Sequence, residues 1–171
     1  METFPQIITV GNQQEGLEFA KEILYKKVDN QTLLLLSGGS TPKGLYETLA
    51  KEKKLAVKAL GMVDERMDRS NYKMIKATGL LDNLKIKFYP MTPAVTCDED
   101  MRKLIDSSKN KIAIMGIGED GHTASLPAGI KNSSFDSAQD KIQNCVAEIN
   151  NFPGEFKERI TLTFKALSKM D

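Results

Sequence analysis

The chain has few of the residues that metal, disulfide or membrane chemistry requires. Its 171 residues include one histidine and two cysteines. Cys97 and Cys145 are far apart and match no metal-ligand spacing, so we expect two reduced thiols and no metal site. No apolar run approaches the length of a membrane span, and the N-terminus lacks the charged-then-apolar layout of a signal peptide. We therefore expect a cytoplasmic protein without a membrane partner.

Charge of neither sign predominates. The sum of Lys and Arg is 24 against 23 for Asp and Glu, and the net charge of +1 gives no reason to expect a nucleic-acid partner. With 40% hydrophobic and 27% charged residues, the composition is that of a globular protein. The length suits a single domain over residues 1–171 with a sizeable core. The sequence does not determine the oligomeric state, and a monomer is slightly favoured.

Apolar runs alternate with helical patterns along the chain. This alternation predicts an α/β fold with a mostly parallel sheet and helices on both faces, a Rossmann-like three-layer arrangement. Strands are expected at residues 7–10, 32–36, 59–63, 86–89, 111–115, 142–149 and 159–164, and helices at 14–27, 41–52, 70–77 and 98–107. Ser70 is the expected N-cap of its helix. The polar segment 130–141 is expected to be a surface loop or a frayed helix.

The single histidine, His122, follows the strand expected at residues 111–115. Gly116, Gly118 and Gly121 allow a tight turn and a close approach of backbone to a ligand. The imidazole therefore leaves the carboxyl end of a strand, where open α/β sheets bind ligands. Histidine is also the side chain best matched to proton transfer near neutral pH. Taken alone, the same pattern also fits a surface-loop histidine beside glycines that only shape a turn.

A second glycine-containing loop, Ser37 to Pro42, lies between a buried strand and a helix. Gly38 and Gly39 expose backbone N–H groups, and Ser40 and Thr41 add hydroxyl donors at a helix N-terminus, which together suit a phosphate. A glycine turn with a Ser or Thr cap accounts for the same residues about equally well.

A cluster of charges, Asp64-Glu65-Arg66, follows the strand expected at residues 59–63. For three charged residues in a row, a solvated loop is the simpler expectation. The alternative is a site, because a guanidinium fork matches phosphate oxygens in a bidentate way. Glu65 is expected to have no direct role.

Four motifs, in order, resemble those of the 6-phosphogluconolactonases, which are related to the glucosamine-6-phosphate deaminases. They are SGGSTP from residue 37, DER from residue 64 followed by Ser70-Asn71, GIGEDGHTASL from residue 116, and RITLT from residue 159. In this family a helix, a strand and more helix follow the RITLT strand. The chain is therefore expected to be a single lactonase-like domain that lacks the C-terminal elements of the family. It also has a short DER-to-SN spacing, and Pro127-Ala128-Gly129 where Phe-Pro-Gly is usual.

The resemblance implies hydrolysis of 6-phosphoglucono-1,5-lactone to 6-phosphogluconate, a step of the pentose phosphate pathway, without a cofactor. His122 is the expected general base that activates water. By resemblance Arg66 helps to hold the phosphate, and Asp64 orients the substrate or His122. The other expected substrate-binding residues are Gly38, Gly39, Ser40, Thr41, Asp120, Gly121, Thr123 and Arg159.

Several alternatives stay open at this point. Asp120 fits a turn that bonds its own backbone about as well as a site, and Arg159 equally fits a cap on a sheet edge. Ser125 lacks the Gly-x-Ser-x-Gly setting of a serine nucleophile. A deaminase is the close enzymatic rival, but deaminases resemble a motif with glutamate five residues after the histidine, where this chain has Pro127. The remaining rival is a degenerate sugar-phosphate-binding module without activity.

Overall fold

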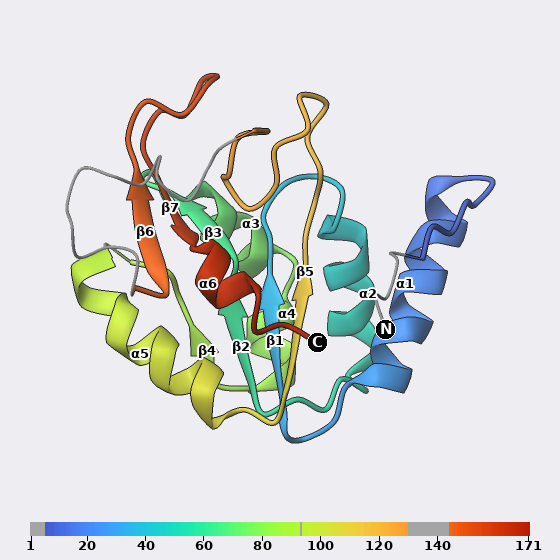
Figure 1. Ribbon diagram of the computed structural model, residues 1–171. Helices are drawn as coiled ribbons and strands as arrows, with labels where there is room; N and C mark the ends of the chain where they lie inside the picture. The colour runs from blue at the N-terminus through green and yellow to red at the C-terminus, as the bar shows by residue number, and fades with distance from the viewer. Residues whose placement is uncertain (1–5, 93, 130–143) are drawn as a thin grey trace.

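The parallel sheet expected from the sequence is present. A computed structural model describes residues 6–92, 94–129 and 144–171. Four parallel strands run in the order β4-β2-β1-β5 (Figure 1). The two central strands, β1 and β2, are buried along their whole length, as continuous apolar runs require in a sheet covered on both faces. The four strands are β1 (Thr32–Leu36), β2 (Ala59–Met62), β4 (Phe88–Tyr89) and β5 (Asn110–Ile114).

Helices cover both faces of this sheet, which confirms the predicted fold class. One layer holds α1 (Gln13–Lys27), α2 (Lys43–Glu52), α3 (Ser70–Ala77) and the short α4 (Leu80–Leu84), with α2 packed against the other three. The opposite face is covered by α5 (Ala94–Ser107) (Figure 1). This division follows from right-handed crossovers, because β1, β2 and β4 step one way across the sheet and β5 returns the other way.

A second, antiparallel sheet was not predicted. Its order is β3-β7-β6, formed by β3 (Asp64–Arg66), β7 (Arg159–Leu162) and β6 (Val146–Ile149). Val63 connects the two sheets, since its N–H donates to Leu36 and its carbonyl accepts from Leu162. The three charged residues after β2 are therefore a strand and not a solvated loop, which places Arg66 directly opposite Arg159.

The strand order brings two loops together at one edge of the parallel sheet. The chain leaves β1 toward β2 on one side, whereas β5 pairs with β1 on its other side. Ligands bind in the crevice outside the carboxyl ends of strands at such a switch point. The loops that follow β1 and β5 carry the SGGSTP and GEDGH motifs, so the topology alone accounts for their convergence.

Several expected elements differ in the structure. Residues 7–10 form no strand, and Ile7 is 86% exposed, because this short apolar run has no neighbouring strand to pair with. Ser70 is the first residue of α3, whose N-cap is Arg69. The strand from residue 159 ends at Leu162 because Thr163 caps the short helix α6 (Phe164–Leu167) through its hydroxyl. The short helix α4 was also not predicted from the sequence.

Two expectations fall on residues that the structure does not describe. These are the loop or frayed helix at 130–141 and the start of the strand expected at 142–149. Within the described residues, no helix is both long enough and apolar enough to cross a membrane.

Candidate active site

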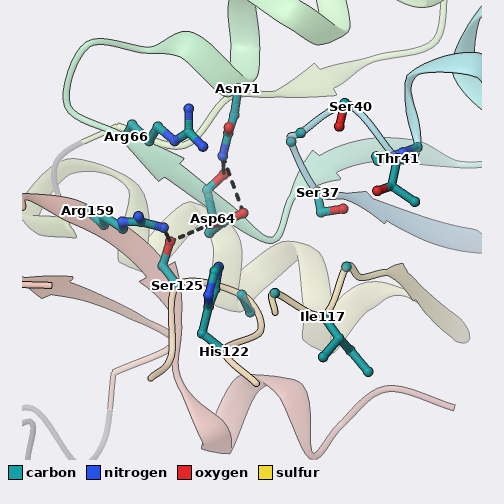
Figure 2. Close-up of a pocket in the computed structure, with 16 residues that line it drawn as sticks. Ser37, Ser40, Thr41, Asp64, Arg66, Asn71, Ile117, His122, Ser125 and Arg159 are labelled. Carbon is teal, nitrogen blue, oxygen red and sulfur yellow. Dashed lines mark hydrogen bonds between the residues drawn. The ribbon is translucent and has the colours of Figure 1, made fainter. Parts of the chain in front are cut away.

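A pocket of about 200 Å³ opens at the switch point between β1 and β5 (Figure 2). Its walls come from the loop after β1, from β3 and β7 of the antiparallel sheet, and from the glycine loop after β5. The lining residues are Ser37, Gly38, Gly39, Ser40, Thr41, Pro42, Asp64, Arg66, Asn71, Gly116, Ile117, Gly118, His122, Ala124, Ser125 and Arg159.

Close packing fixes the glycine loop after β1. A Cβ at Gly38 would lie 2.0 Å from Asn71 Oδ1, so only glycine fits beside this buried asparagine. Gly39 has a φ of 95°, which side chains rarely adopt. Glycine is therefore needed at both positions for different reasons. Asn71 approaches the backbone closely at Gly38, and the backbone is left-handed at Gly39.

Asp64 is a buried carboxylate at the centre of the pocket. Ser125 Oγ donates to its Oδ2 at 2.5 Å, and Asn71 Nδ2 donates to its Oδ1 at 3.4 Å. Burial raises the pKa of Asp64, and this effect outweighs the opposing effects of the Ser125 hydrogen bond and of the charge on Arg159. The ionised form is therefore held at a cost in free energy, which is common for groups at functional sites.

Two arginines flank Asp64 from the antiparallel sheet. Arg66 and Arg159 are paired across β3 and β7, and Figure 2 shows both on the same side of Asp64. Neither forms an ion pair with a carboxylate of the described residues. Burial, and then repulsion by Arg66, lowers the pKa of Arg159. Two neighbouring guanidinium groups that are in direct contact with no carboxylate of the described residues can hold an anion.

Two phenylalanines of the β6–β7 connection hold these arginines. The guanidinium of Arg66 lies over the Phe156 ring at 4.1 Å, and that of Arg159 lies over Phe152 at 3.5 Å. The same Phe152 ring contacts the His122 imidazole edge-on, with ring centroids 5.2 Å apart. One buried aromatic ring therefore positions both a cation and the imidazole.

His122 reaches the pocket from the loop after β5. Its Nδ1 lies 2.5 Å from Asp120 Oδ1, and its backbone carbonyl accepts from Gly118 N at 2.8 Å. The hydrogen bond with His122 lowers the pKa of Asp120. A Cβ at Gly118 would lie 2.4 Å from the imidazole, and Gly121 has a φ of 79°. Both glycines are therefore required by the path of the loop around the ring.

A tight turn follows His122 and presents Ser125 to the pocket. Thr123 and Leu126 close it with two backbone hydrogen bonds, while Ala124 and Ser125 have φ values of 50° and 55°. Such values are strained for residues with a side chain. The Thr161 hydroxyl donates to the Ala124 carbonyl, which ties the turn to β7. The strained turn places the Ser125 hydroxyl between Asp64 and Arg159, to which it is bonded at 2.5 and 3.4 Å.

Glu65 faces away from the pocket and supports α3. Its carboxylate accepts from the N–H groups of Arg66, Asn71 and Tyr72 at 2.8 to 3.0 Å. It therefore satisfies the first turn of the helix, where free N–H groups otherwise lack partners. That Glu65 has no direct role in the reaction remains a prediction.

The structure brings most of the predicted site residues into one pocket. Those that line it are Gly38, Gly39, Ser40, Thr41, Asp64, Arg66, His122 and Arg159. Three others do not line it: Asp120 contacts the imidazole, Gly121 shapes the loop, and Thr123 donates to the Gly116 carbonyl at 2.8 Å.

Ser37, Asn71, Ser125 and Phe152 are among the residues in or beside the pocket that were not predicted. Ser37, Asn71 and Ser125 lie inside the recognised motifs, so their motif positions were the available signal. No sequence feature pointed to Phe152, because its contacts with Arg159 and His122 depend on the antiparallel sheet, which was not predicted.

The chain is similar to known proteins over nearly its whole length. A family model described as glucosamine-6-phosphate isomerases/6-phosphogluconolactonase matches residues 14–170. The chain belongs to this family. A 6-phosphogluconolactonase of Xylella fastidiosa (strain 9a5c) is 34% identical over 95% of this chain and 77% of its own length. That of strain Temecula1 is 35% identical over 71% of this chain, which spans 59% of that relative.

A solved structure of the family has the same fold. The 6-phosphogluconolactonase of Thermotoga maritima superposes with a TM-score of 0.68 and 23% sequence identity, covering 95% of this chain and 78% of that one. Within the described part of this family member, no three His, Cys, Asp or Glu side chains group as metal ligands. The expected lack of a metal or cofactor stays a prediction.

Proposed function

We propose that this chain hydrolyses 6-phosphoglucono-1,5-lactone to 6-phosphogluconate. The observation that carries the proposal is that one pocket holds an imidazole and two arginines that form no direct ion pair among the described residues. A sugar-phosphate lactone needs both parts, an anion site for the phosphate and a base for the ester. The lactonase names of the relatives support the same reaction, and assignment of each residue's role is part of the proposal.

Arg66 and Arg159 bind the phosphate. A phosphate dianion between the two guanidinium groups removes their mutual repulsion and accepts hydrogen bonds from both forks. Stacking on Phe156 and Phe152 keeps the two side chains extended toward the pocket, so little rotamer freedom is lost on binding. Ser40 and Thr41 lie on the other side of Asp64 in Figure 2 and bind the far end of the substrate. From the sequence, the phosphate is expected beside Gly39, Ser40 and Thr41 with Arg66 or Arg159 within reach; the site proposed here keeps the arginines and places the phosphate away from that loop.

His122 is the general base. The Asp120 carboxylate holds the proton on Nδ1, which leaves Nε2 with a lone pair to accept a proton from water. As water attacks the C1 carbonyl, His122 takes its proton and the carbonyl oxygen becomes an oxyanion. Backbone N–H groups of the glycine loop after β1 stabilise that charge. The bond between C1 and the ring oxygen then breaks, and His122 returns the proton to this oxygen as it leaves.

Asp64 orients the substrate. Its hydrogen bonds from Ser125 and Asn71 fix the carboxylate within the pocket, where it can accept from a sugar hydroxyl. In an isomerase or deaminase, a carboxylate here would instead move protons between sugar carbons. The residue after Leu126 is Pro127, where the deaminase motif carries glutamate, so the lactonase reaction is the one we propose.

The reaction is tested with freshly generated lactone, because the compound also hydrolyses by itself in water and this background must be subtracted. The wild-type protein is expected to release acid well above background and to release no ammonia from glucosamine 6-phosphate. Ammonia release without lactone hydrolysis would favour the deaminase, and binding of 6-phosphogluconate without turnover would favour the binding module.

The phosphate clamp is tested by Arg66→Ala, with Arg102→Ala as a control at an arginine outside the pocket. Loss of a charged hydrogen-bond partner is expected to weaken 6-phosphogluconate binding by roughly 10- to 100-fold. The Arg102 variant is expected to bind like the wild type. Equal affinity in the Arg66→Ala variant and the wild type would exclude Arg66 from the phosphate site.

A monomeric state and a cytoplasmic location remain predictions from the sequence.

A further inference from the structure

Ser37 lies at the carboxyl end of β1, at the wall of the pocket, and its backbone is fixed. It is 6% exposed. Its N–H donates to the Ile114 carbonyl at 3.1 Å, and its own carbonyl accepts from the Tyr46 hydroxyl at 3.0 Å. Both backbone groups are therefore satisfied, which leaves the side-chain hydroxyl as the one polar group of this residue still to be accounted for.

Within the described residues, the Ser37 hydroxyl forms no hydrogen bond of good geometry, although the Tyr46 hydroxyl, which donates to the Ser37 carbonyl, lies beside it. Among the described residues, it is the only buried side-chain oxygen or nitrogen of which this is true. A buried hydroxyl without a partner destabilises the fold, whereas alanine at the same place would not. Ser37 lines the pocket, and Figure 2 shows its side chain among those of Asp64, Thr41 and Ile117. A buried polar group without a partner at the wall of a ligand pocket indicates that a ligand supplies the partner.

We propose that Ser37 is a substrate-binding residue whose hydroxyl bonds an oxygen of the sugar portion of the substrate. This inference rests on the proposed lactonase function. A serine hydroxyl both donates and accepts, which matches the hydroxyls of a sugar. The phosphate is assigned to Arg66 and Arg159, on the opposite side of Asp64 from Ser37 in Figure 2, so the sugar portion lies nearer to Ser37.

Ser37→Ala separates binding from stability. Because the variant removes a buried hydroxyl without a partner, its melting temperature without ligand is expected to rise. Its affinity for 6-phosphogluconate is expected to fall roughly 3- to 10-fold, the usual range for one neutral hydrogen bond. Its affinity for inorganic phosphate, which lacks the sugar, is expected to match that of the wild type.

Ser108→Ala is the matched control. Ser108 is also buried, at 5% exposure, but its hydroxyl donates to the Leu104 carbonyl at 2.7 Å, away from the pocket. This variant is expected to lower the melting temperature and to leave both affinities unchanged. The two serine variants should thus shift stability in opposite directions, and only Ser37→Ala should weaken ligand binding.

Three results would overturn the inference. Equal 6-phosphogluconate affinity in Ser37→Ala and wild type would remove Ser37 from the binding site. An equal loss of inorganic phosphate affinity would place its contact at the phosphate and not at the sugar. A wild-type protein that neither binds 6-phosphogluconate nor hydrolyses the lactone would refute the proposed function, and the Ser37 inference with it.

Discussion

Gly38→Ala tests the packing that supports the pocket. The new Cβ would lie 2.0 to 2.7 Å from the Oδ1, Cγ and Cβ atoms of Asn71, so this buried side chain must move. Overpacking costs about 1–3 kcal/mol, and loss of the two long hydrogen bonds from Asn71 to Asp64 adds roughly 1 kcal/mol. A change of 1 kcal/mol shifts the melting temperature of a chain of this size by about 2–4 °C, so the melting temperature of Gly38→Ala should be roughly 4–16 °C below that of the wild type. Turnover should fall as well, because Asp64 loses one of its two side-chain partners.

Gly116→Ala is the control for this variant. A Cβ at Gly116 would meet no atom within 4 Å, and the φ of Gly116 is not positive. The melting temperature of the Gly116→Ala variant is therefore expected to stay near that of the wild type. In an Asn71→Gly background, which removes the obstructing side chain, Gly38→Ala should cost much less. A full penalty in that background, measured by thermal or chemical unfolding, would show that the clash with Asn71 is not the reason for the glycine.

The remaining predictions concern the imidazole, the carboxylate and the aromatic ring. Gly118→Ala should lower kcat with little change in melting temperature, because its Cβ displaces the half-exposed ring of His122; an unchanged kcat would contradict this. Asp64→Asn should stabilise the protein at neutral pH while reducing turnover. Burial raises the pKa of Asp64 in the folded state, so protonation of this carboxyl favours folding. As the pH falls through that pKa, the free energy of unfolding of the wild type should therefore rise relative to that of the variant. Unfolding measured at several pH values tests this. Phe152→Leu should weaken phosphate binding and lower kcat together, because Phe152 contacts both Arg159 and His122; a loss of only one would separate the two contacts.

The parallel half of the fold could be predicted because its signals are local. The run Leu33–Leu36 consists of four leucines and is followed, after Ser37, by two glycines, and the strand in the structure, Thr32–Leu36, has the expected bounds. The loop of His122 follows in the same way from the strand before it. A strand predicted from such a run also gives the edge of the sheet at which its loop emerges.

The antiparallel half depends on long-range pairing that no local pattern reveals. Asp64, Glu65 and Arg66 form a strand of three residues, too short for an alternating pattern to be recognised. Their partners in β7 begin at Arg159, more than ninety residues later along the chain. The choice between a phosphate contact and a sheet-edge cap at Arg159 therefore could not be made from the sequence. Residues 7–10 show the converse, since an apolar run without a partner strand stays exposed.

Roles that depend on long-range contacts could not be predicted even for residues within the motifs. The sequence around Ser125 does not fit a serine nucleophile and indicates no other role for its hydroxyl. In the structure its hydroxyl links Asp64 to Arg159, and this depends on the left-handed turn at Ala124 and Ser125. Left-handed backbone at residues other than glycine is held by tertiary contacts, here by the hydrogen bond from Thr161, and is not encoded by the residues of the turn themselves.

The pH dependence of kcat/KM, compared with the NMR titration of His122, tests the central claim most directly. Because His122 is the only histidine, its imidazole signals need no assignment among several rings. If its neutral form is the general base, kcat/KM for the lactone should fall at acid pH with the same midpoint as the titration of this ring in the free protein. His122→Ala should lack this dependence and lose roughly 10²- to 10⁴-fold in kcat. Background-corrected lactonase activity that does not change across the His122 titration, or that survives in His122→Ala, would contradict the account.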